Sequence, residues 1–178
     1  MPTAFYGYVT GNRTTSILER PLQIRTLAPT ALAVAATAVS GTLATRPAVE
    51  SAWYAKLRKP PYQPPRQAFP IAWTSLYADI AVVSAQTLDD APPEVRRTYI
   101  RALLTNLVLN GGWSWLFFNQ RKLGASAVTA GLLTVSSADL TRRAAAVRGV
   151  KAAPLGLYPV WCAFATALST HIWVLNRR

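Results

Sequence analysis

The feature that most constrains this chain is a set of five long stretches almost without charged residues. Four of them have 19 to 25 residues, one with the single acid Asp79, and the other has 16 residues and reaches a similar length if Asp139 lies at the headgroups. A helix crosses a hydrocarbon core of about 30 Å with about 20 mostly apolar residues. The sequence therefore predicts an all-α integral membrane protein, a bundle of five transmembrane helices. The expected spans are about 26–45, 67–88, 100–120, 123–140 and 152–176.

The charge of the chain agrees with this interpretation. Its formal net charge is +12, with 19 basic and 7 acidic residues, and in a soluble domain such an excess would suggest nucleic-acid binding. Here the basic residues lie between the expected spans, where Lys and Arg contact lipid headgroups. We therefore expect membrane lipid and no nucleic acid as a partner, and a multi-pass protein of a bacterial cell membrane. The two sides of the membrane carry 10 and 9 basic residues, so the positive-inside rule does not predict the orientation.

The first residues differ in composition from the rest of the chain. Residues 1–25 are polar and contain no apolar run of the kind found in cleavable signal peptides. We expect a flexible N-terminal arm over residues 1–25 and a single membrane domain over residues 26–178.

The scarcity of metal ligands and nucleophiles excludes several kinds of site. One cysteine, Cys162, and one histidine, His171, cannot form an internal disulfide, an ordinary zinc site or a haem held by two histidines. We expect no metal, interpret Cys162 as a small apolar residue, and consider His171 either a packing residue or a single haem ligand. The chain also lacks a glycine-rich phosphate loop and a pair of carboxylates on one predicted helix face, which argues against a conventional soluble-type enzyme.

The connection between the first two spans is long and rich in proline. Prolines at positions 60, 61, 64 and 65 fix φ and favour a stiff, extended path. One interpretation is a rigid linker whose Trp53 and Tyr54 lie at the membrane interface. The other is a structured lid over a cavity between the helices.

Two polar features lie within the expected spans. Asn106, Asn110, Trp113 and Phe117 are spaced by four, three and four residues, so they share one helix face. The two amides either bond to neighbouring helices or form a polar rim that orients a ligand. Asp79 is an acid inside a span and therefore a candidate functional residue, facing another helix or a second copy of the chain.

Three blocks of residues, in order along the chain, resemble the TspO/MBR family of tryptophan-rich sensory and translocator proteins. Trp53 to Pro65 matches the pattern W-Y-x-x-L-x-K-P-P-x-x-P-P and is followed by Trp73-Thr-Ser-Leu-Tyr77. Residues 110–118 resemble N-x-x-W-S-x-L-F-F, and the stretch from Tyr158 to Asn176 resembles the last family helix. The resemblance runs from about residue 28 to the C-terminus.

The resemblance implies a membrane receptor or carrier that binds porphyrins in a cavity between five helices, under the proline-rich lid. Protoporphyrin IX is the expected ligand, with haem and other hydrophobic molecules as further candidates, in tetrapyrrole and stress regulation. No other cofactor is required. An enzyme-like alternative is light-dependent porphyrin degradation with Trp73 and Trp161 as catalytic residues, and a third possibility is a scaffold whose aromatic residues only pack. The expected ligand-binding residues are Tyr54, Pro64, Phe69, Trp73, Asn106, Asn110, Trp113, Phe117, Trp161, Ala165 and Leu168.

The sequence also departs from the family pattern. Tyr62 and Gln67 replace tryptophans of the proline-rich block, and Ser169 replaces an asparagine. The family's proposed cholesterol motif fails because Thr170 and Val174 occupy its tyrosine and basic places, so we do not expect sterol binding. The resemblance further implies a homodimer, and small residues that allow helices to approach closely are plentiful. They are Ala102, Gly111, Gly112, Ala125, Ala127, Ala130 and Gly131.

Overall fold

The computed structural model describes residues 23–177. The predicted flexible arm, residues 1–25, lies outside the described residues except for its last three, of which Ile24 and Arg25 already belong to the first helix.

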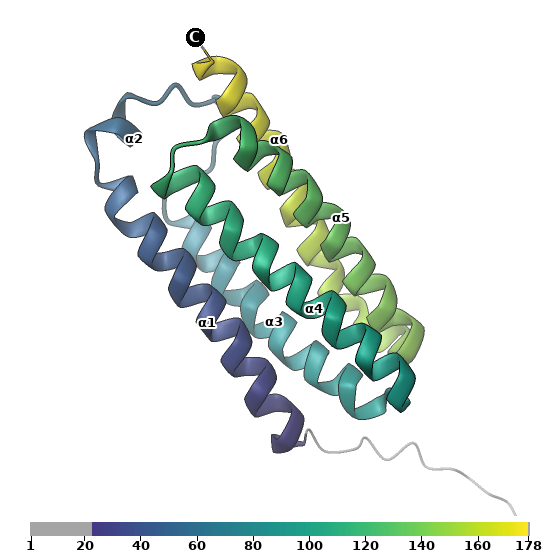
Figure 1. Ribbon diagram of the computed structural model, residues 1–178. Coiled ribbons are helices and arrows are strands. Elements are labelled where there is room, and N and C mark those ends of the chain that lie inside the picture. The colour runs from purple at the N-terminus through teal and green to yellow at the C-terminus, as the bar shows by residue number, and fades with distance from the viewer. Residues whose placement is uncertain (1–22, 178) are drawn as a thin grey trace, which may run out of the picture.

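Five long helices dominate the described part of the chain, which contains no strand, and this confirms the predicted all-α bundle (Figure 1). Two short elements interrupt or join the long helices: a π-helical turn, η1, continues α4, and a 3-10 stretch, η2, joins α5 to α6. The elements are α1 (Ile24–Val49), α2 (Ala52–Lys56), α3 (Ala68–Asp90), α4 (Pro93–Ser114), η1 (Trp115–Asn119), α5 (Leu123–Arg148), η2 (Gly149–Gly156) and α6 (Leu157–Asn176).

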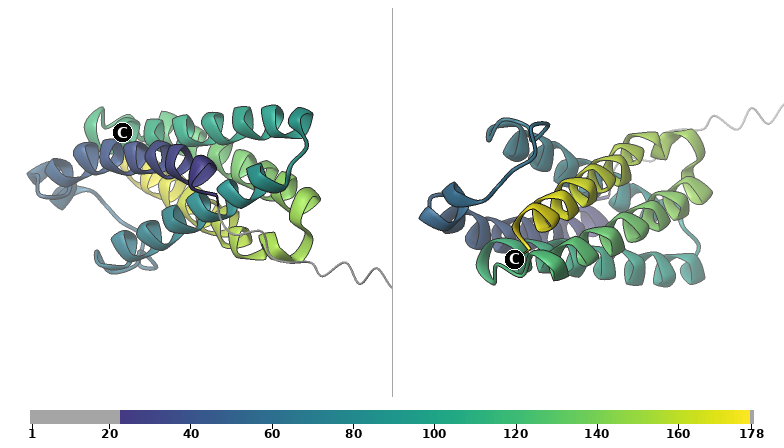
Figure 2. Two further views of the ribbon diagram at one scale, coloured as in Figure 1. Left: turned by 90° about the horizontal axis from the view of Figure 1, so that it is seen from below. Right: turned by 90° about the horizontal axis from the view of Figure 1, so that it is seen from above.

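The long helices run alternately up and down the bundle. α1 packs against α3 and α4, and α5 packs against α4 and α6. The first and last described residues therefore lie at opposite ends (Figure 1). In both views of Figure 2, α2 and the proline-rich residues after it lie at one end of the bundle, where α6 also ends. We call residues 50–67 the proline-rich segment.

The helices extend beyond the spans expected from the sequence. α4 begins at Pro93, well before residue 100, and α5 continues to Arg148, well beyond residue 140. The expected spans cover only the charge-free stretches. A helix can continue beyond such a stretch into the headgroup region, because arginine side chains there reach water. The last expected span began at residue 152, but residues up to Gly156 form the 3-10 stretch, and α6 starts at Leu157.

The surface and the interior of the bundle suit a membrane. α1, α3 and the helical stretch Leu123–Asn176 have the length and apolar composition of membrane spans. Large apolar side chains are exposed along the helices, and Val108, Val135 and Val160 are each more than two-thirds exposed. Inside, the fully buried side chains of Asn106, Asn110 and Tyr158 bond to one another, as a solvent without hydrogen-bonding groups requires.

Candidate functional site

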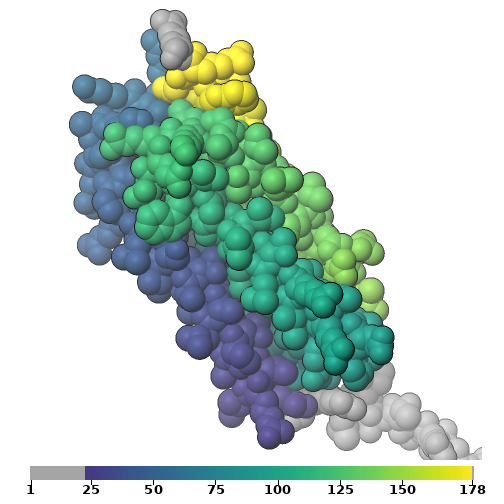
Figure 3. All heavy atoms as spheres, viewed as in Figure 1, coloured from purple at the N-terminus to yellow at the C-terminus, as the bar shows by residue number. Residues whose placement is uncertain are grey.

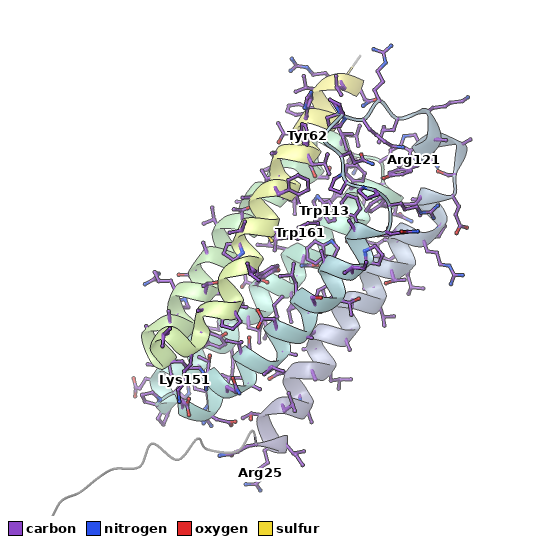
Figure 4. All side chains as sticks on the ribbon, turned by 180° about the vertical axis from the view of Figure 1, so that it is seen from behind. Arg25, Tyr62, Trp113, Arg121, Lys151 and Trp161 are labelled. Atoms are coloured by element: carbon purple, nitrogen blue, oxygen red, sulfur yellow. The ribbon has the colours of Figure 1, made fainter. Side chains whose placement is uncertain are left out.

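A cavity of about 380 Å³ lies between α1, α3, α4 and α6, next to the proline-rich segment. In Figure 4, Trp113 lies in the interior of the bundle, nearer the end marked by Tyr62 and Arg121 than the end marked by Arg25 and Lys151. The cavity therefore belongs to the end of the bundle that the proline-rich segment covers. Its volume falls within the range of small-molecule sites, about 300–1,000 Å³.

One wall of the cavity is a continuous group of aromatic rings. Trp73 of α3 stacks on Tyr77, with ring centroids 5.4 Å apart and an angle of 30° between the planes. It also lies 6.4 Å from Trp113 of α4, which in turn lies 5.8 Å from Phe117. Phe69, one helical turn before Trp73, lines the same wall. Such a surface suits a flat, apolar ligand, because aromatic rings stack on flat π-systems.

The cavity has a basic edge. Arg46 at the end of α1 and Arg66 of the proline-rich segment both line it, together with Gln63. Arg66 lies 3.9 Å from Glu50, but both side chains are about two-thirds exposed, so this ion pair is weak. The two guanidinium groups are therefore available to an anionic group on a ligand.

The α1 side of the cavity was missed by the sequence analysis. Ala38, Thr42, Thr45 and Val49 line it and are spaced by four, three and four residues, so they share one helix face. Gly41 also lines the cavity, and a Cβ placed there would lie 3.3 Å from the Ser114 Oγ of α4. The row of mostly small residues is visible in the sequence, but nothing in it distinguishes a cavity face from a lipid-facing one. In the structure it leaves room that larger side chains would fill.

The proline-rich segment is fixed to the bundle at its centre. The Asn176 side chain at the end of α6 accepts a hydrogen bond from the Arg58 N–H (3.0 Å) and donates one to the Arg58 carbonyl (2.9 Å). Tyr62 contacts the same helix: its hydroxyl lies 3.2 Å from His171 Nδ1, and its ring packs edge-on against Phe164.

Aromatic contacts hold the start of the proline-rich segment. Trp53 packs edge-on against Phe117 (6.4 Å), and Tyr54 packs against Phe118 (6.1 Å). The ammonium group of Lys59 lies 4.0 Å from the centre of the Tyr54 ring, a cation–π contact. Burial raises the pKa of the Tyr54 hydroxyl above its ordinary value. These contacts give the segment a defined conformation.

The structure brings together part of the expected ligand-binding set. The residues that line the cavity are Tyr54, Phe69, Trp73, Trp113, Phe117 and Leu168. The residues that do not line it are Pro64, Asn106, Asn110, Trp161 and Ala165.

The two asparagines of α4 are buried in hydrogen bonds between helices. Tyr77 donates to Asn110 (2.8 Å), Asn110 donates to Tyr158 (3.0 Å), and Tyr158 donates to Asn106 (2.7 Å). Asn106 then donates to Ser136 of α5 (3.3 Å). Asn106 shares a helix face with Phe117 but lies about 16 Å further along the axis. Because the cavity occupies only one end of the bundle, Phe117 lines it and Asn106 does not, although the two residues share a helix face.

Trp161 lies behind the aromatic wall. Its ring is perpendicular to that of Trp73, with centroids 6.4 Å apart, and it also packs edge-on against Phe69. Its indole nitrogen is buried without a hydrogen-bond partner among the described residues. Trp161 thus contacts the wall residue Trp73 and is not itself part of the cavity surface.

The remaining singled-out residues lie outside the cavity wall. Cys162 is buried, and His171 contacts Tyr62. Asp79 is half-buried and has no ion-pair partner among residues 23–177. The described residues contain no group of three or more potential metal ligands.

Comparison with known proteins decides the family. A sequence profile of the TspO/MBR family matches residues 29–174. The chain belongs to this family. It is 33% identical over 162 residues to the tryptophan-rich protein TspO of Archaeoglobus fulgidus, a match that covers 87% of this chain and 99% of that protein.

Two further relatives come from Bos taurus and Bacillus subtilis. The chain is 34% identical over 129 residues to the translocator protein of Bos taurus, covering 70% of this chain and 75% of that protein. It is 30% identical over 128 residues to the uncharacterized membrane protein YtaB of Bacillus subtilis, covering 72% and 83%. Family membership and the apolar helices together make this protein an integral membrane protein.

Proposed function

We propose that this TspO/MBR protein is a receptor or carrier that binds an anionic porphyrin, with protoporphyrin IX as the ligand to test. The observation that supports this most directly is the combination of an aromatic wall and a basic edge in one cavity. A porphyrin has a flat π-face, which Trp73 and Trp113 can contact, and carboxylates at one side, which Arg46 and Arg66 can pair with.

The proline-rich segment would act as the lid of this site. Tyr54, Gln63 and Arg66 of the segment line the cavity, and Asn176 holds the segment near the end of α6. A bound porphyrin would therefore be covered on the side facing the headgroups. A role in controlling tetrapyrrole levels in a bacterial cell membrane would follow from such a site.

The charge at the cavity edge provides the test. Protoporphyrin IX and its dimethyl ester share the ring and differ at the two carboxylates, which the ester neutralises and methylates. Their affinities for the purified protein can be compared by the shift of the Soret band. We expect the free acid to bind more tightly, and we expect the double variant Arg46→Gln/Arg66→Gln to remove most of that preference.

A matched control and a contradicting result complete the test. Arg96 and Arg97 are exposed arginines of α4 outside the cavity, so the Arg96→Gln/Arg97→Gln protein should keep the preference. Binding of neither porphyrin by the wild-type protein would refute the proposed function. Equal binding of both porphyrins would refute the role of the two arginines at the cavity edge.

A second candidate function is light-dependent porphyrin degradation. The contact between Trp73 and Trp161 favours it, because adjacent indoles can pass an electron toward a photoexcited porphyrin on the cavity side. In this scheme the excited porphyrin takes one electron from Trp73 and passes it to dioxygen, which becomes superoxide, while Trp161 shares the Trp73 radical and delays charge recombination. The ring then returns one electron to the tryptophan pair, and the resulting porphyrin radical cation combines with superoxide, so that the net reaction consumes one porphyrin and one dioxygen. Illumination of the complex separates the two functions: undiminished loss of the Soret band in Trp73→Phe/Trp161→Phe would remove both residues from the chemistry.

A further inference from the structure

A second hollow, of about 360 Å³, lies between α4 and α5 and shares no residue with the first cavity. Figure 3 shows the face of the molecule on which α4 lies between α1 and α5. The residues around the hollow come from the first 13 residues of α4, Pro93 to Thr105, and from the second half of α5. We call this hollow the α4–α5 groove.

The α4–α5 groove carries an excess of positive charge. Arg101 and Arg143 line it from the two helices, and Asp139 is the one acid among its lining residues. The carboxylate of Asp139 is already engaged by Arg142, at 2.7 Å, and by Arg143. Within residues 23–177, Arg101 has no ion-pair partner.

Hydroxyl groups complete the lining of the groove. Thr98, Thr105 and Ser136 lie among its residues, interspersed with the two arginines. The Ser136 hydroxyl accepts a hydrogen bond from Asn106, so its own hydrogen is free to donate toward the groove. The Thr98 hydroxyl already donates to the Val95 carbonyl (2.9 Å). The guanidinium forks and the Ser136 hydroxyl donor together suit an anion with several oxygens, above all a phosphate group.

The position of the groove along the helices corresponds to the membrane surface. The charge-free stretch of α4 begins directly after Arg101, and that of α5 ends directly before Asp139. Both helices therefore leave the hydrocarbon core at the level of the groove. Figure 4 shows Arg25 and Lys151 at one end of the bundle, the end where α4 begins and α5 finishes, opposite the proline-rich segment. The groove thus lies at the depth of lipid phosphates, on the side away from the cavity mouth.

An apolar track continues from the groove toward the membrane centre. Val108 of α4, one turn beyond Thr105, is 73% exposed. On α5, Leu132 lies one turn from Ser136 and is 54% exposed, and Val128, one turn further on, is 64% exposed. These side chains continue the same helix faces as the groove residues. A free phosphate ion would make no use of this track, whereas an acyl chain would cover it.

We propose that the α4–α5 groove binds an anionic phospholipid, with its phosphate between Arg101 and Arg143 and an acyl chain along Val108 and Leu132. The proposal does not depend on porphyrin binding, because the two sites share no residue. In this proposal the lipid phosphate is the ion-pair partner of Arg101.

Native mass spectrometry of the full chain tests the proposal. The purified protein is released from detergent in the presence of equal amounts of phosphatidylglycerol and phosphatidylcholine. We expect the wild-type protein to retain phosphatidylglycerol preferentially and Arg101→Gln to lower that preference about five-fold. Arg97→Gln, an exposed arginine on the same helix outside the groove, is the matched control and should change the preference less than two-fold.

Further measurements exclude misfolding of the variants and binding of free phosphate as explanations of the result. Circular dichroism checks that each variant keeps its helix content, and Arg101→Lys, which keeps the charge, should lose less of the preference than Arg101→Gln. Inorganic phosphate in hundred-fold excess should leave phosphatidylglycerol bound. The proposal is overturned if Arg97→Gln lowers the preference as much as Arg101→Gln, if Arg101→Gln has no effect, or if inorganic phosphate displaces the lipid.

Discussion

Trp73 is the residue on which the cavity depends most. It stacks on Tyr77, contacts Trp113 and receives the edge of Trp161 from behind. One side chain therefore connects the aromatic residues of α3, α4 and α6. Removing it would open the wall and also leave Trp161 without its main neighbour on that side.

The contact between Trp73 and Trp161 predicts non-additive substitutions. Trp73→Ala should weaken protoporphyrin IX binding by about 1–3 kcal/mol, by analogy with bases stacked on aromatic residues, which corresponds to about five- to a hundred-fold. Trp161→Ala should weaken it less, because Trp161 acts through Trp73. In the double variant the loss should be smaller than the sum, as for residues that share a partner. Strictly additive losses in Soret-band titrations of the four proteins would show that the two residues act independently.

At the scale of elements, a chain of side-chain hydrogen bonds joins α3, α4, α6 and α5 through the centre of the bundle. It runs from Tyr77 through Asn110, Tyr158 and Asn106 to Ser136. Every donor in this chain points in the same direction, and the Tyr77 hydroxyl donates its hydrogen to Asn110. The chain therefore links the packing of four helices to the position of one cavity residue, Tyr77.

Tyr158→Phe tests the contribution of this chain to stability. The variant removes one hydroxyl that accepts from Asn110 and donates to Asn106, and both amides are fully buried. We expect a loss of about 1–2 kcal/mol in the free energy of unfolding. Unfolding by a denaturing detergent, followed by circular dichroism, measures it. Tyr62→Phe, at an exposed tyrosine, should shift the midpoint less, and equal midpoints for wild type and Tyr158→Phe would contradict the expectation.

The proline-rich segment is the other element with a testable role. Replacing Pro60, Pro61, Pro64 and Pro65 with glycine would raise the conformational entropy of the open segment, so we expect porphyrin affinity to fall about ten-fold with unchanged helix content. Asn176→Ala, which removes both hydrogen bonds to Arg58, should increase hydrogen exchange of residues 57–59.

The exposed Asn119 supplies a control for the Asn176 variant. Asn119→Ala should leave hydrogen exchange in the proline-rich segment unchanged. A glycine variant that binds porphyrin as tightly as the wild-type protein would show that the segment is not a lid.

At the scale of the whole molecule, the predicted homodimer needs surfaces that the bundle does not already use. Ala127 and Ala130, two of the small residues singled out in the sequence, are buried inside the bundle. A Cβ on Gly111 would lie 3.9 Å from Thr37, and Gly131 is equally close to Thr166. These positions serve packing within one chain. Ala125 is exposed and remains available to a second copy.

We expect a dimer in detergent, and light scattering corrected for bound detergent measures its mass. Ala125→Leu should lower the dimer fraction if α5 forms the contact, whereas Ala153→Leu, at an exposed alanine of η2, serves as the control. A monomer mass for the wild-type protein at all concentrations would contradict the predicted homodimer.

The number of long helices followed from the sequence because charges are costly in hydrocarbon, and the five charge-free stretches mark where the chain avoids them. The helix ends were less predictable. A helix such as α5 continues past Asp139 into the headgroup region, where charged side chains reach water and no desolvation free energy opposes them. The aromatic wall was predictable from motif residues such as Trp73 and Phe117. The α1 wall, with Thr42 and Thr45, was not, because small residues in a lipid-facing helix look the same whether they face lipid or a cavity.

The central claim is that the aromatic cavity is the porphyrin site, and one affinity measurement tests it. Protoporphyrin IX is titrated into Trp73→Ala/Trp113→Ala and into Trp115→Ala/Trp173→Ala, which removes two tryptophans outside the cavity wall. The Soret band reports binding, so the loss of tryptophan fluorescence does not interfere. We predict that the cavity variant binds at least ten-fold more weakly than the wild-type protein and that the other variant stays within two-fold. Equal affinities of the two double variants would contradict the claim.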